Sequence, residues 1–290
     1  MGDKQILFSV VVPVSKMAGK LNRLSNWLTE IDFEECEVFL VHDIQDIHTG
    51  PELEDLIMRQ AQPNLKLLSG NWNNPGGPRN FGLSQIQGKW TTFWDSDDLP
   101  LVINVLSALK SGSEFDVLVG SFQLIDSTTG NVLRTEVVNE LEDIFFNPGI
   151  WRMIFKSNLL TDLKFPELRM GEDQIFLLHL QMWDRKIKFS KEIFYQYFRN
   201  QSGQLTTQKS AISDLQTTIK ITFDFFRKSN SPENLYVGIM LVRQCLTLLK
   251  RNPTLGILTS MPVFLYLLFL KQPLSVKILK KLLVKNAGSK

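Results

Sequence analysis

The sequence predicts an α/β protein with a mainly parallel sheet flanked by helices and a C-terminal helical extension. Over the first 98 residues, short apolar runs typical of buried strands alternate with amphipathic segments typical of helices, in the order strand, helix, strand, helix, strand, helix, strand. From about residue 207 the apolar spacing is helical and no further strand pattern follows. These two observations carry the fold prediction.

Each element of the first half has a local signature. The expected strands are runs of β-branched, aliphatic and aromatic residues at 6–12, 37–41, 65–68 and 90–94. The expected helices between them lie at 21–31, from Pro51 onward, and at about 79–87, ending at Gly88. Polar residues that follow such strands line the binding crevice of a parallel sheet.

A mixed region follows and then gives way to helices. We expect a hairpin of strands 115–125 and 132–138, a helix over 174–183, and two strands at 186–189 and 193–198. Ser231-Pro232-Glu233 predicts the start of a helix that runs to about Lys250, and Asn252-Pro253 predicts its end. We find no internal repeat and no low-complexity linker.

Composition is that of an ordinary globular protein, but charge is unevenly distributed. The chain has 290 residues, 43% hydrophobic, and a net charge of +2, which does not suggest a nucleic-acid partner. No acidic residue follows Glu233, whereas nine basic residues do. Because the whole chain carries +2 and this last part +9, the first 233 residues carry −7.

Two features bear on the cellular compartment. The two cysteines, Cys36 and Cys245, show no metal-ligand spacing and predict a reducing, cytoplasmic environment without disulfides. The N-terminus runs directly into an apolar strand, without a basic segment or a small-residue cleavage site. We therefore do not expect a signal peptide.

Clustered carboxylates follow the fourth strand. Asp95, Asp97 and Asp98 stand within four positions just before Pro100, which places them on a turn, and Asp43 ends the second strand. Carboxylates at strand ends are hard oxygen ligands that suit a divalent cation. The alternative is a solvated acidic loop.

Five segments in this order resemble an inverting family-two glycosyltransferase with the Rossmann-like GT-A fold. They are Val-Val-Val-Pro at 10–13, the strand that ends in Asp43, Gly-Gly-Pro-Arg-Asn-Phe-Gly-Leu at 76–83, Phe-Trp-Asp-Ser-Asp-Asp at 93–98, and Gly-Glu-Asp at 171–173. The resemblance covers about residues 5–206. It implies a catalytic domain over 1–206, with a nucleotide-binding half at about 1–98 and an acceptor half at 99–206, followed by the helical region 207–290.

The resemblance implies a nucleotide-sugar donor, most simply UDP-linked, and a divalent metal, Mn²⁺ or Mg²⁺. Asp97 resembles the direct metal ligand, and Asp95 resembles the acid that contacts the ribose or reaches the metal. The donor-binding residues implied are Pro13, Asp43, Arg79, Asp95 and Ser96. Asp98 is as well suited to holding the turn as to contacting a ligand. Asn80 is suited to capping or orienting its helix.

For the acceptor side, the resemblance implies that Asp173 is the general base and that Glu172 positions sugar or base. Two acids at a helix N-terminus also suit the helix dipole, which is the purely structural reading. Trp151 fits either stacking on a sugar or burial as a core aromatic. His42 stands where the family has an acid, so the preferred nucleotide is open, and an ordinary strand-end histidine is the simpler interpretation.

The Gln-x-x-Arg-Trp motif of processive synthases is absent. We therefore expect transfer of one sugar per encounter to a hydroxyl of a glycan or lipid-linked glycan, as in surface polysaccharide biosynthesis. The alternative is a non-catalytic nucleotide- or glycan-binding protein on a degenerate transferase fold. It predicts loss of the metal or base acids, and both are present.

The segment 252–290 combines apolar and basic residues. Nineteen uncharged residues separate Arg251 from Lys271, but Pro253, Gly256 and Pro262 disfavour a membrane-spanning helix. Lys277, Lys281 and Lys285 recur every four residues and so share one face of the expected helix. Leu274, Ile278 and Leu282 share another face. This pattern favours peripheral contact with the inner face of the plasma membrane. The alternative is a helical cap on the catalytic domain.

Overall fold

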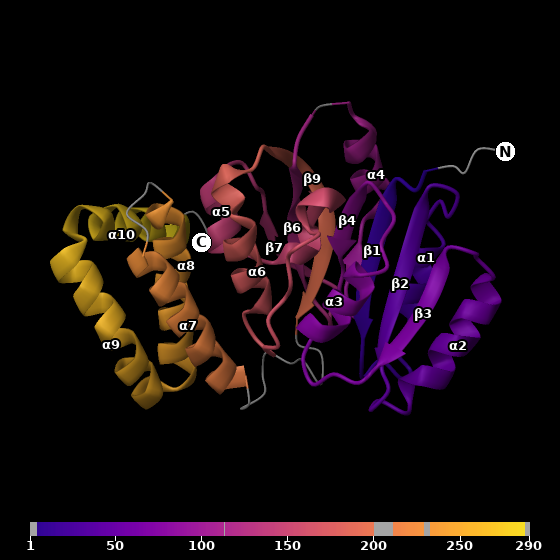
Figure 1. Ribbon diagram of the computed structural model, residues 1–290, viewed down its shortest axis with the longest axis horizontal. Coiled ribbons are helices and arrows are strands. Elements are labelled where there is room, and N and C mark those ends of the chain that lie inside the picture. The colour runs from indigo at the N-terminus through magenta and orange to yellow at the C-terminus, as the bar shows by residue number, and fades with distance from the viewer. Residues whose placement is uncertain (1–4, 113, 200–210, 229–232, 288–290) are drawn as a thin grey trace. The chain divides into compact units, whose positions relative to one another are not determined.

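The computed structural model describes residues 5–112, 114–199, 211–228 and 233–287, which form two compact units (Figure 1). The first unit takes residues 1–139, 149–168 and 184–204, and the second takes 140–148, 169–183 and 205–290. Two short segments from the middle of the chain thus group with the C-terminal helices. The division between the units therefore does not coincide with the expected domain boundary after residue 206.

The first unit is built on parallel strands joined by helices, as expected. The strands are β1 (Phe8–Val14), β2 (Cys36–Asp43), β3 (Leu65–Gly70) and β4 (Trp90–Phe93), in the spatial order β3-β2-β1-β4. The connecting helices are α1 (Asn22–Leu28), α2 (Thr49–Gln60) and α3 (Gly76–Leu83).

The sheet continues as a mixed sheet beyond β4. Its further elements are β5 (Leu99–Pro100), α4 (Val102–Lys110), β6 (Val117–Asp126), β7 (Val132–Glu136), the short helix η1 (Ile150–Arg152), β8 (Met153–Lys156), η2 (Ser157–Leu159) and β9 (Ile187–Arg199). The expected hairpin is the antiparallel pair β6–β7. The two strands expected at 186–198 form the single strand β9, which stays paired with β6 by leaving residues 191, 192 and 194 of β9 without a partner at two shifts of register.

The strand order changes direction between β1 and β4. The chain moves outward from β1 through β2 to β3 and then returns to place β4 on the other side of β1. The Trp94 N–H donates to the Val11 carbonyl at 3.1 Å, so the acidic segment begins where β1 and β4 end side by side. Such a reversal opens a crevice at the carboxyl ends of the strands.

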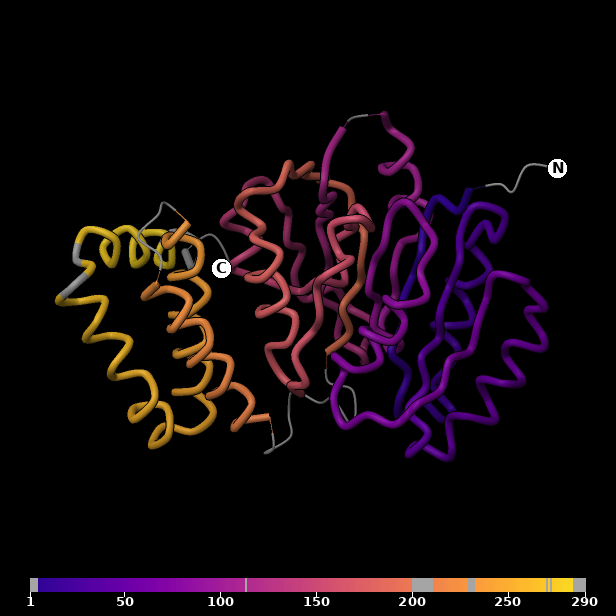
Figure 2. The backbone as a smooth tube through the Cα atoms, in the orientation of Figure 1, coloured from indigo at the N-terminus to yellow at the C-terminus, as the bar shows by residue number. Residues whose placement is uncertain are grey.

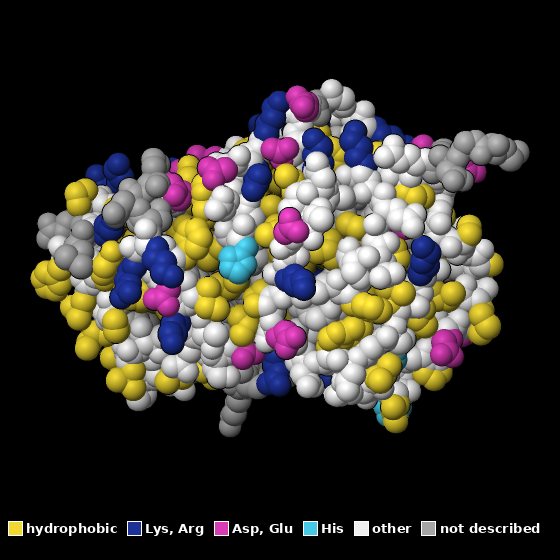
Figure 3. Space-filling view, in the orientation of Figure 1, with side chains coloured by type: hydrophobic (Ala, Val, Ile, Leu, Met, Phe, Trp, Pro, Cys, Tyr) yellow, Lys and Arg dark blue, Asp and Glu magenta, His cyan; other side chains and the backbone are white. Residues whose placement is uncertain are grey.

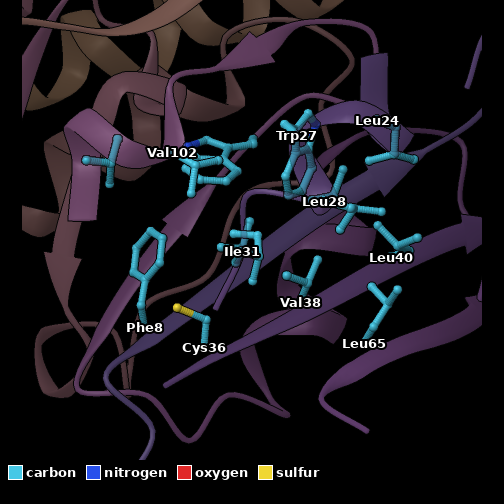
Figure 4. Packing of buried hydrophobic residues seen from close by; sticks show 14 of the residues in the cluster. Phe8, Leu24, Trp27, Leu28, Ile31, Cys36, Val38, Leu40, Leu65 and Val102 are labelled. Carbon is cyan, nitrogen blue, oxygen red and sulfur yellow. The ribbon is translucent and has the colours of Figure 1, made fainter. Parts of the chain in front are cut away.

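A hydrophobic core of aliphatic and aromatic side chains supports this edge (Figure 4). Trp94 is fully buried and packs edge-to-face against Trp27 of α1, with ring centroids 5.1 Å apart, and against Phe8 of β1 at 5.8 Å. Edge-to-face pairs of buried aromatic rings add to the free energy gained from burial alone. This packing fixes the residue that immediately precedes the acidic turn.

Helix α3 begins earlier than the sequence suggested, at Gly76 instead of about Arg79, and ends at Leu83. The Asn74 side chain accepts the Gly77 N–H at 2.9 Å and so satisfies one donor of the first turn. A methyl group on Gly82 would lie 2.4 Å from a methyl carbon of Val11. The glycine therefore permits the close approach of α3 to β1.

The second unit is helical over its described residues. It contains α5 (Leu141–Phe146), α6 (Glu172–Leu180), most of the short helix η3 (Met182–Asp184), α7 (Ala211–Lys228), α8 (Asn234–Arg251), α9 (Pro253–Leu270) and α10 (Gln272–Ala287). The predicted break at Asn252-Pro253 is confirmed. The Asn252 side chain accepts the Leu255 N–H at 3.1 Å, and Pro253 takes the first helical position of α9.

Helices α9 and α10 meet at a sharp bend (Figure 2). No helix within the described ranges is both long and apolar enough to cross a membrane by itself. The two segments 253–269 and 273–283 meet that requirement of length and composition only when taken together, across a bend of 117°.

Candidate functional site

Arg79 and Asp95 form an ion pair at the crevice edge of the first unit. A guanidinium nitrogen of Arg79 donates to Asp95 Oδ1 at 2.8 Å, and the arginine is only 5% exposed. Arg79 also lies over the Phe165 ring, 5.5 Å from its centroid. Asn80 holds the same segment, because its side-chain amide exchanges two hydrogen bonds with the Phe165 backbone at 2.8 and 2.9 Å. Asn80 thus orients α3.

Asp98 is enclosed by β9 and the preceding turn. It is 1% exposed, and its Oδ1 accepts the Phe198 N–H at 2.7 Å. Burial, reinforced by the nearby charges of Asp97 and Asp95, raises the pKa of Asp98 well above its usual range. Of the two interpretations left open by the sequence, these contacts favour a carboxyl group that holds the turn.

Asp97 lies partly exposed between these two acids. Burial first, and then the negative charge of Asp95, raise the pKa of Asp97 to about 6, while Arg23 and Lys20 act in the opposite direction. Arg23, from α1, donates to the Asp97 carbonyl at 2.6 Å and lies 3.7 Å from the centroid of the Phe198 ring. Arg23 therefore holds the backbone of the turn. The negative charge of the Asp97 carboxylate is offset only in part by Arg23 and Lys20.

Tyr195 connects the acidic turn to β9. Its hydroxyl accepts the Asp95 N–H at 3.0 Å, and burial together with the charge of Asp98 raises the pKa of Tyr195 well above its usual range. Trp151 stacks on Tyr195, with centroids 4.5 Å apart, and on Tyr197 at 5.6 Å. Trp151 is partly buried and packs against the core, so the structure supports its structural role and leaves sugar stacking a prediction.

The expected nucleotide side of the site lies at the ends of β1 and β2. Pro13 is paired in register with Val41, and Ser96 is buried in the acidic turn. Asp43 ends β2 and accepts the Gln45 N–H at 3.1 Å, leaving its carboxylate partly exposed. His42 is buried, and its Nε2 hydrogen-bonds to the Asp46 carbonyl at 3.0 Å. His42 is thus a packed strand-end residue, as the simpler interpretation predicted.

The loop after β1 is tied to α2 by backbone donors. The Gly19 N–H lies 2.9 and 3.0 Å from the two carboxylate oxygens of Glu52, and the Met17 N–H donates to the Thr49 hydroxyl at 2.9 Å. The Lys16 N–H donates to the Asp46 carboxylate, and Lys16 itself has a left-handed backbone, with φ of 61°. The sequence patterns did not predict these contacts.

Two carboxylates in the second unit start α6. Gly171 precedes the helix with φ of +89°, and a methyl group there would lie 2.5 Å from the Thr218 hydroxyl oxygen. Asp173 is partly exposed and its Oδ1 accepts the Gln174 N–H at 2.8 Å, whereas Glu172 is buried. Glu172 and Asp173 belong to the second unit, whereas Asp95 and Asp97 belong to the first. Each pair is therefore described only within its own unit.

A metal at the acidic turn would rely on few protein ligands. Within the described residues, no group of three or more histidine, cysteine, aspartate or glutamate side chains is arranged to hold a metal ion. Magnesium typically takes only one or two carboxylates and completes its shell with water and phosphate oxygens. The carboxylate oxygens of Asp97 and Asp95 are suitable ligands for such a cation. The charge of Asp95 contributes to the raised pKa of Asp97, and a bound cation would relieve that repulsion.

Comparison with known protein families decides the classification. The model of a family described as glycosyl transferase family 2 matches residues 9–171, which is more than half of the chain. The matched range includes the acidic turn and α3. The chain belongs to glycosyl transferase family 2. The resemblance noted from the sequence is thereby confirmed.

Curated relatives of this family-2 chain are glycosyltransferases by name. The poly(ribitol-phosphate) β-N-acetylglucosaminyltransferase TarS of Staphylococcus aureus is 29% identical over 215 residues, covering 68% of this chain and 36% of TarS. A Campylobacter jejuni GalNAc(5)-diNAcBac-PP-undecaprenol β-1,3-glucosyltransferase is 24% identical, covering 70% of this chain and 69% of the relative. This chain thus spans only about a third of the length of TarS.

Solved structures of similar fold are GT-A transferases. The crystal structure of residues 1–349 of TarS in complex with UDP-GlcNAc superposes with a TM-score of 0.64 at 21% identity, covering 94% of this chain and 79% of that fragment. The mannosyltransferase PcManGT of Pyrobaculum calidifontis, in complex with GDP-Man and Mn²⁺, gives a TM-score of 0.57 at 13% identity, covering 95% and 86%. At these identities the likeness establishes the fold, and the expected GT-A fold is confirmed.

Sequence reasoning missed the residues that this family-2 chain uses to hold the acidic turn. Arg23, Tyr195 and Phe198 contact the turn from 74 to 100 residues away in the chain. The only available signal was the aromatic alternation in the last strand, which places Tyr195 and Tyr197 on one face of β9. That signal predicts a shared face but not what the face contacts.

Proposed function

We propose that this protein is a metal-dependent, inverting, non-processive glycosyltransferase. In this proposal it moves one sugar from a nucleotide diphosphate, UDP by preference, to a hydroxyl of a glycan. The observation that carries the proposal is the pair Asp95 and Asp97 at the carboxyl edge of β4, with Arg79 fixing the first of them at 2.8 Å, in a chain of glycosyl transferase family 2.

The proposed donor site uses the strand ends of the first unit. Asp43, at the end of β2, has a partly exposed carboxylate that suits the N–H groups of a base such as uracil. Pro13, near the end of β1, and Ser96, just after β4, are proposed to contact the donor at the same edge of the sheet. The UDP-GlcNAc complex of TarS supports the choice of a UDP-linked donor, whereas PcManGT binds GDP-Man, so the base is the first property to test.

Asp97 is the proposed direct metal ligand, and Asp95 the outer one, since one of its oxygens already accepts from Arg79. A bound Mn²⁺ or Mg²⁺ would supply positive charge to the leaving diphosphate. Arg79 orients the Asp95 carboxylate, and Arg23 and Tyr195 hold the backbone of the turn in place. These residues present the acids in one geometry before any donor arrives.

The proposed chemistry inverts the anomeric centre. The acceptor hydroxyl attacks the anomeric carbon from the side opposite the diphosphate, which leaves, and the hydroxyl gives its proton to the carboxylate of Asp173. Oδ1 of Asp173 accepts the Gln174 N–H, which keeps the side chain at the N-terminus of α6. Glu172 and Trp151 are proposed to position the acceptor or the transferred sugar.

The proposed acceptor is a bacterial surface glycan, either polymeric or lipid-linked. The names of TarS and of the Campylobacter transferase support this class, the first for a poly(ribitol-phosphate) and the second for an undecaprenol-linked glycan. The missing Gln-x-x-Arg-Trp motif supports transfer of a single sugar. A cytoplasmic location is proposed from the two free, buried cysteines.

The test measures nucleotide binding and sugar transfer with defined ligands. We expect UDP with Mn²⁺ to raise the Tm of the wild type, UDP with EDTA to raise it less, and Asp97→Asn to lose the metal-dependent part. Asp55→Asn, an exposed acid paired with Arg59 on α2, is the matched control and keeps the full shift. UDP-GlcNAc, UDP-glucose and GDP-mannose are then compared for donor hydrolysis. Equal Mn²⁺ dependence in wild type and Asp97→Asn contradicts the metal assignment, and no hydrolysis of any donor contradicts the enzyme.

A further inference from the structure

Helix α9 has apolar residues on two opposite faces. One face is buried within the second unit, with Ser260, Val263 and Leu267 almost fully covered. The other face is open to solvent although it is just as apolar. Its residues follow a helical spacing and are each between 45% and 68% exposed: Ile257, Leu258, Met261, Leu265, Leu268 and Phe269.

Helix α10 extends this open face. Ile278 is buried against α8, where a methyl group on Gly238 would lie 2.4 Å from the Ile278 side chain. Val276, Leu279 and Leu283 point away from that contact and are each at least half exposed. We call the exposed apolar residues of α9 and α10 together the α9–α10 surface. In Figure 3, hydrophobic side chains gather over α9.

A groove of about 460 Å³ opens within the α9–α10 surface. Its lining from α8, α9 and α10 is almost entirely apolar, and Met261, Leu265, Leu268 and Leu279 belong both to the groove and to the exposed surface. Contiguous apolar surfaces of this kind on a folded protein mark an interaction site for another apolar phase or protein.

The charged residues that α10 itself contributes beside this surface are all basic. No acidic residue follows Glu233 anywhere in the chain, and Lys277 and Lys280 of α10 are exposed next to the apolar residues. Lys281, which the sequence placed in the basic row, instead pairs with Glu142 of α5 at 2.8 Å. The side chain of Lys285, the third member of that row, lies outside the described residues. Basic residues beside an apolar face complement anionic phospholipid head groups.

We propose that the α9–α10 surface docks on the interface of an anionic lipid bilayer. The apolar residues of α9 and α10 enter the boundary between head groups and acyl chains, while Lys277 and Lys280 contact the head groups. Charge favours a bilayer over a second copy of the chain, because α9 and α10 contain no acidic residue and two copies joined through these helices would bring the exposed Lys277 and Lys280 of each copy together. The nearby acids Glu140 and Glu142, at the start of α5, already pair with Lys281. The 117° bend lays both helices along an interface.

This binding stands apart from the proposed sugar transfer, because vesicles are tested without donor or metal. The full chain is sedimented with phosphatidylcholine vesicles, with and without phosphatidylglycerol. We expect strong sedimentation only with phosphatidylglycerol. We expect Lys277→Glu with Lys280→Glu to weaken the vesicle partition coefficient about tenfold or more, and Leu258→Gln with Phe269→Gln to weaken it about tenfold or more through lost apolar burial.

Matched controls separate this surface from general stickiness. Met58 and Ile103, of α2 and α4 in the first unit, are as exposed as Leu258 and Phe269. Met58→Gln with Ile103→Gln should leave sedimentation unchanged. All substituted side chains are exposed, so each variant should keep the wild-type Tm, and circular dichroism checks that each folds.

Three results would overturn the proposal. The first is equal binding to both vesicle types, or binding that neither double variant weakens. The second is protein that resists extraction with alkaline carbonate, which indicates a segment inserted across the bilayer. The third is absence of vesicle binding together with a dimer in sedimentation velocity that Leu258→Gln with Phe269→Gln dissociates, which assigns the surface to a second copy.

Discussion

At the scale of single residues, three carboxylates within four positions repel one another, and the fold offsets this repulsion differently for each. Asp95 has the guanidinium of Arg79 at 2.8 Å. Asp98 is buried, and its raised pKa favours the neutral form that the interior tolerates. Asp97 keeps a partly exposed carboxylate with a pKa of about 6. Asp97 is therefore the acid whose ionised form gains most from an added cation.

The raised pKa of Asp97 makes a pH-dependent stability prediction for metal-free protein. A carboxyl whose pKa rises from its ordinary 3.8 to about 6 on folding binds protons more tightly in the folded state, so its contribution to stability falls as pH rises from about 4 through 6. We expect the Tm of Asp97→Asn minus the Tm of wild type to be more positive at pH 7.5 than at pH 4.5, with EDTA present in both measurements.

Two further comparisons sharpen this test. Asp55→Asn, which removes an exposed acid, should show no comparable change with pH in its Tm difference from wild type. Adding Mn²⁺ and UDP at pH 7.5 should reverse the advantage of Asp97→Asn, since only the wild type has the ligand. A pH-independent Tm difference between Asp97→Asn and wild type would contradict the raised pKa.

The proposed base gives a second prediction at this scale. Asp173→Asn keeps an oxygen that accepts the Gln174 N–H, so α6 should start unchanged. Loss of a general base typically lowers the rate by ~10²–10⁴. We expect Asp173→Asn to bind UDP with wild-type affinity by calorimetry and to lower kcat for transfer by about that factor. Near-normal turnover would remove Asp173 from the role.

At the scale of elements, the sequence predicts strands far better than it predicts what they contact. β1 to β4 could be predicted because strands buried on both faces show as continuous apolar runs, and the acids at their ends follow from the parallel connection. The contacts of β9 could not. Tyr195 reaches the Asp95 N–H because β9 pairs with β5, Tyr195 opposite Pro100, and that register depends on two irregularities within β9, at residues 190–195, where it pairs with β6. The sequence pattern predicted two separate strands there and did not predict their register.

The start of α6 gives a prediction about one element. Gly171→Ala places a methyl group on a left-handed backbone and within 2.5 Å of the Thr218 hydroxyl oxygen. We expect a loss of stability of about 2–4 kcal/mol from the two causes together, and a fall in kcat because Asp173 stands two residues later.

A matched glycine separates the two causes. Gly112 has a similar φ of +71°, but a methyl group there meets nothing within 4 Å. Gly112→Ala should therefore lose only about 1 kcal/mol, the cost of the left-handed backbone alone. Chemical denaturation of both variants measures the difference, and equal losses would show that the Thr218 contact is easily relieved.

At the scale of the whole molecule, the second unit gathers segments from three parts of the chain. Phe145 of α5 stacks on Tyr236 of α8, with centroids 5.4 Å apart, and Lys281 of α10 pairs with Glu142. Thr218 of α7 donates to the Met170 carbonyl at 3.0 Å, just before α6. The helix that carries the proposed base is therefore packed by residues beyond 206.

This arrangement predicts the fate of a chain that ends at residue 206. It would retain α5 and α6 but lose α7 to α10, so that Phe145 would lose its stacking partner Tyr236 and the Met170 carbonyl its hydrogen bond from Thr218. Apolar side chains uncovered in this way bind fluorescent dyes and promote aggregation. We expect the 1–206 fragment to bind anilinonaphthalene sulfonate, to show weaker near-ultraviolet circular dichroism per residue than the full chain, and to transfer no sugar. A soluble 1–206 fragment with a cooperative melt and full activity would instead make residues 207–290 a separable appendage, and would place the boundary where the sequence pattern changes.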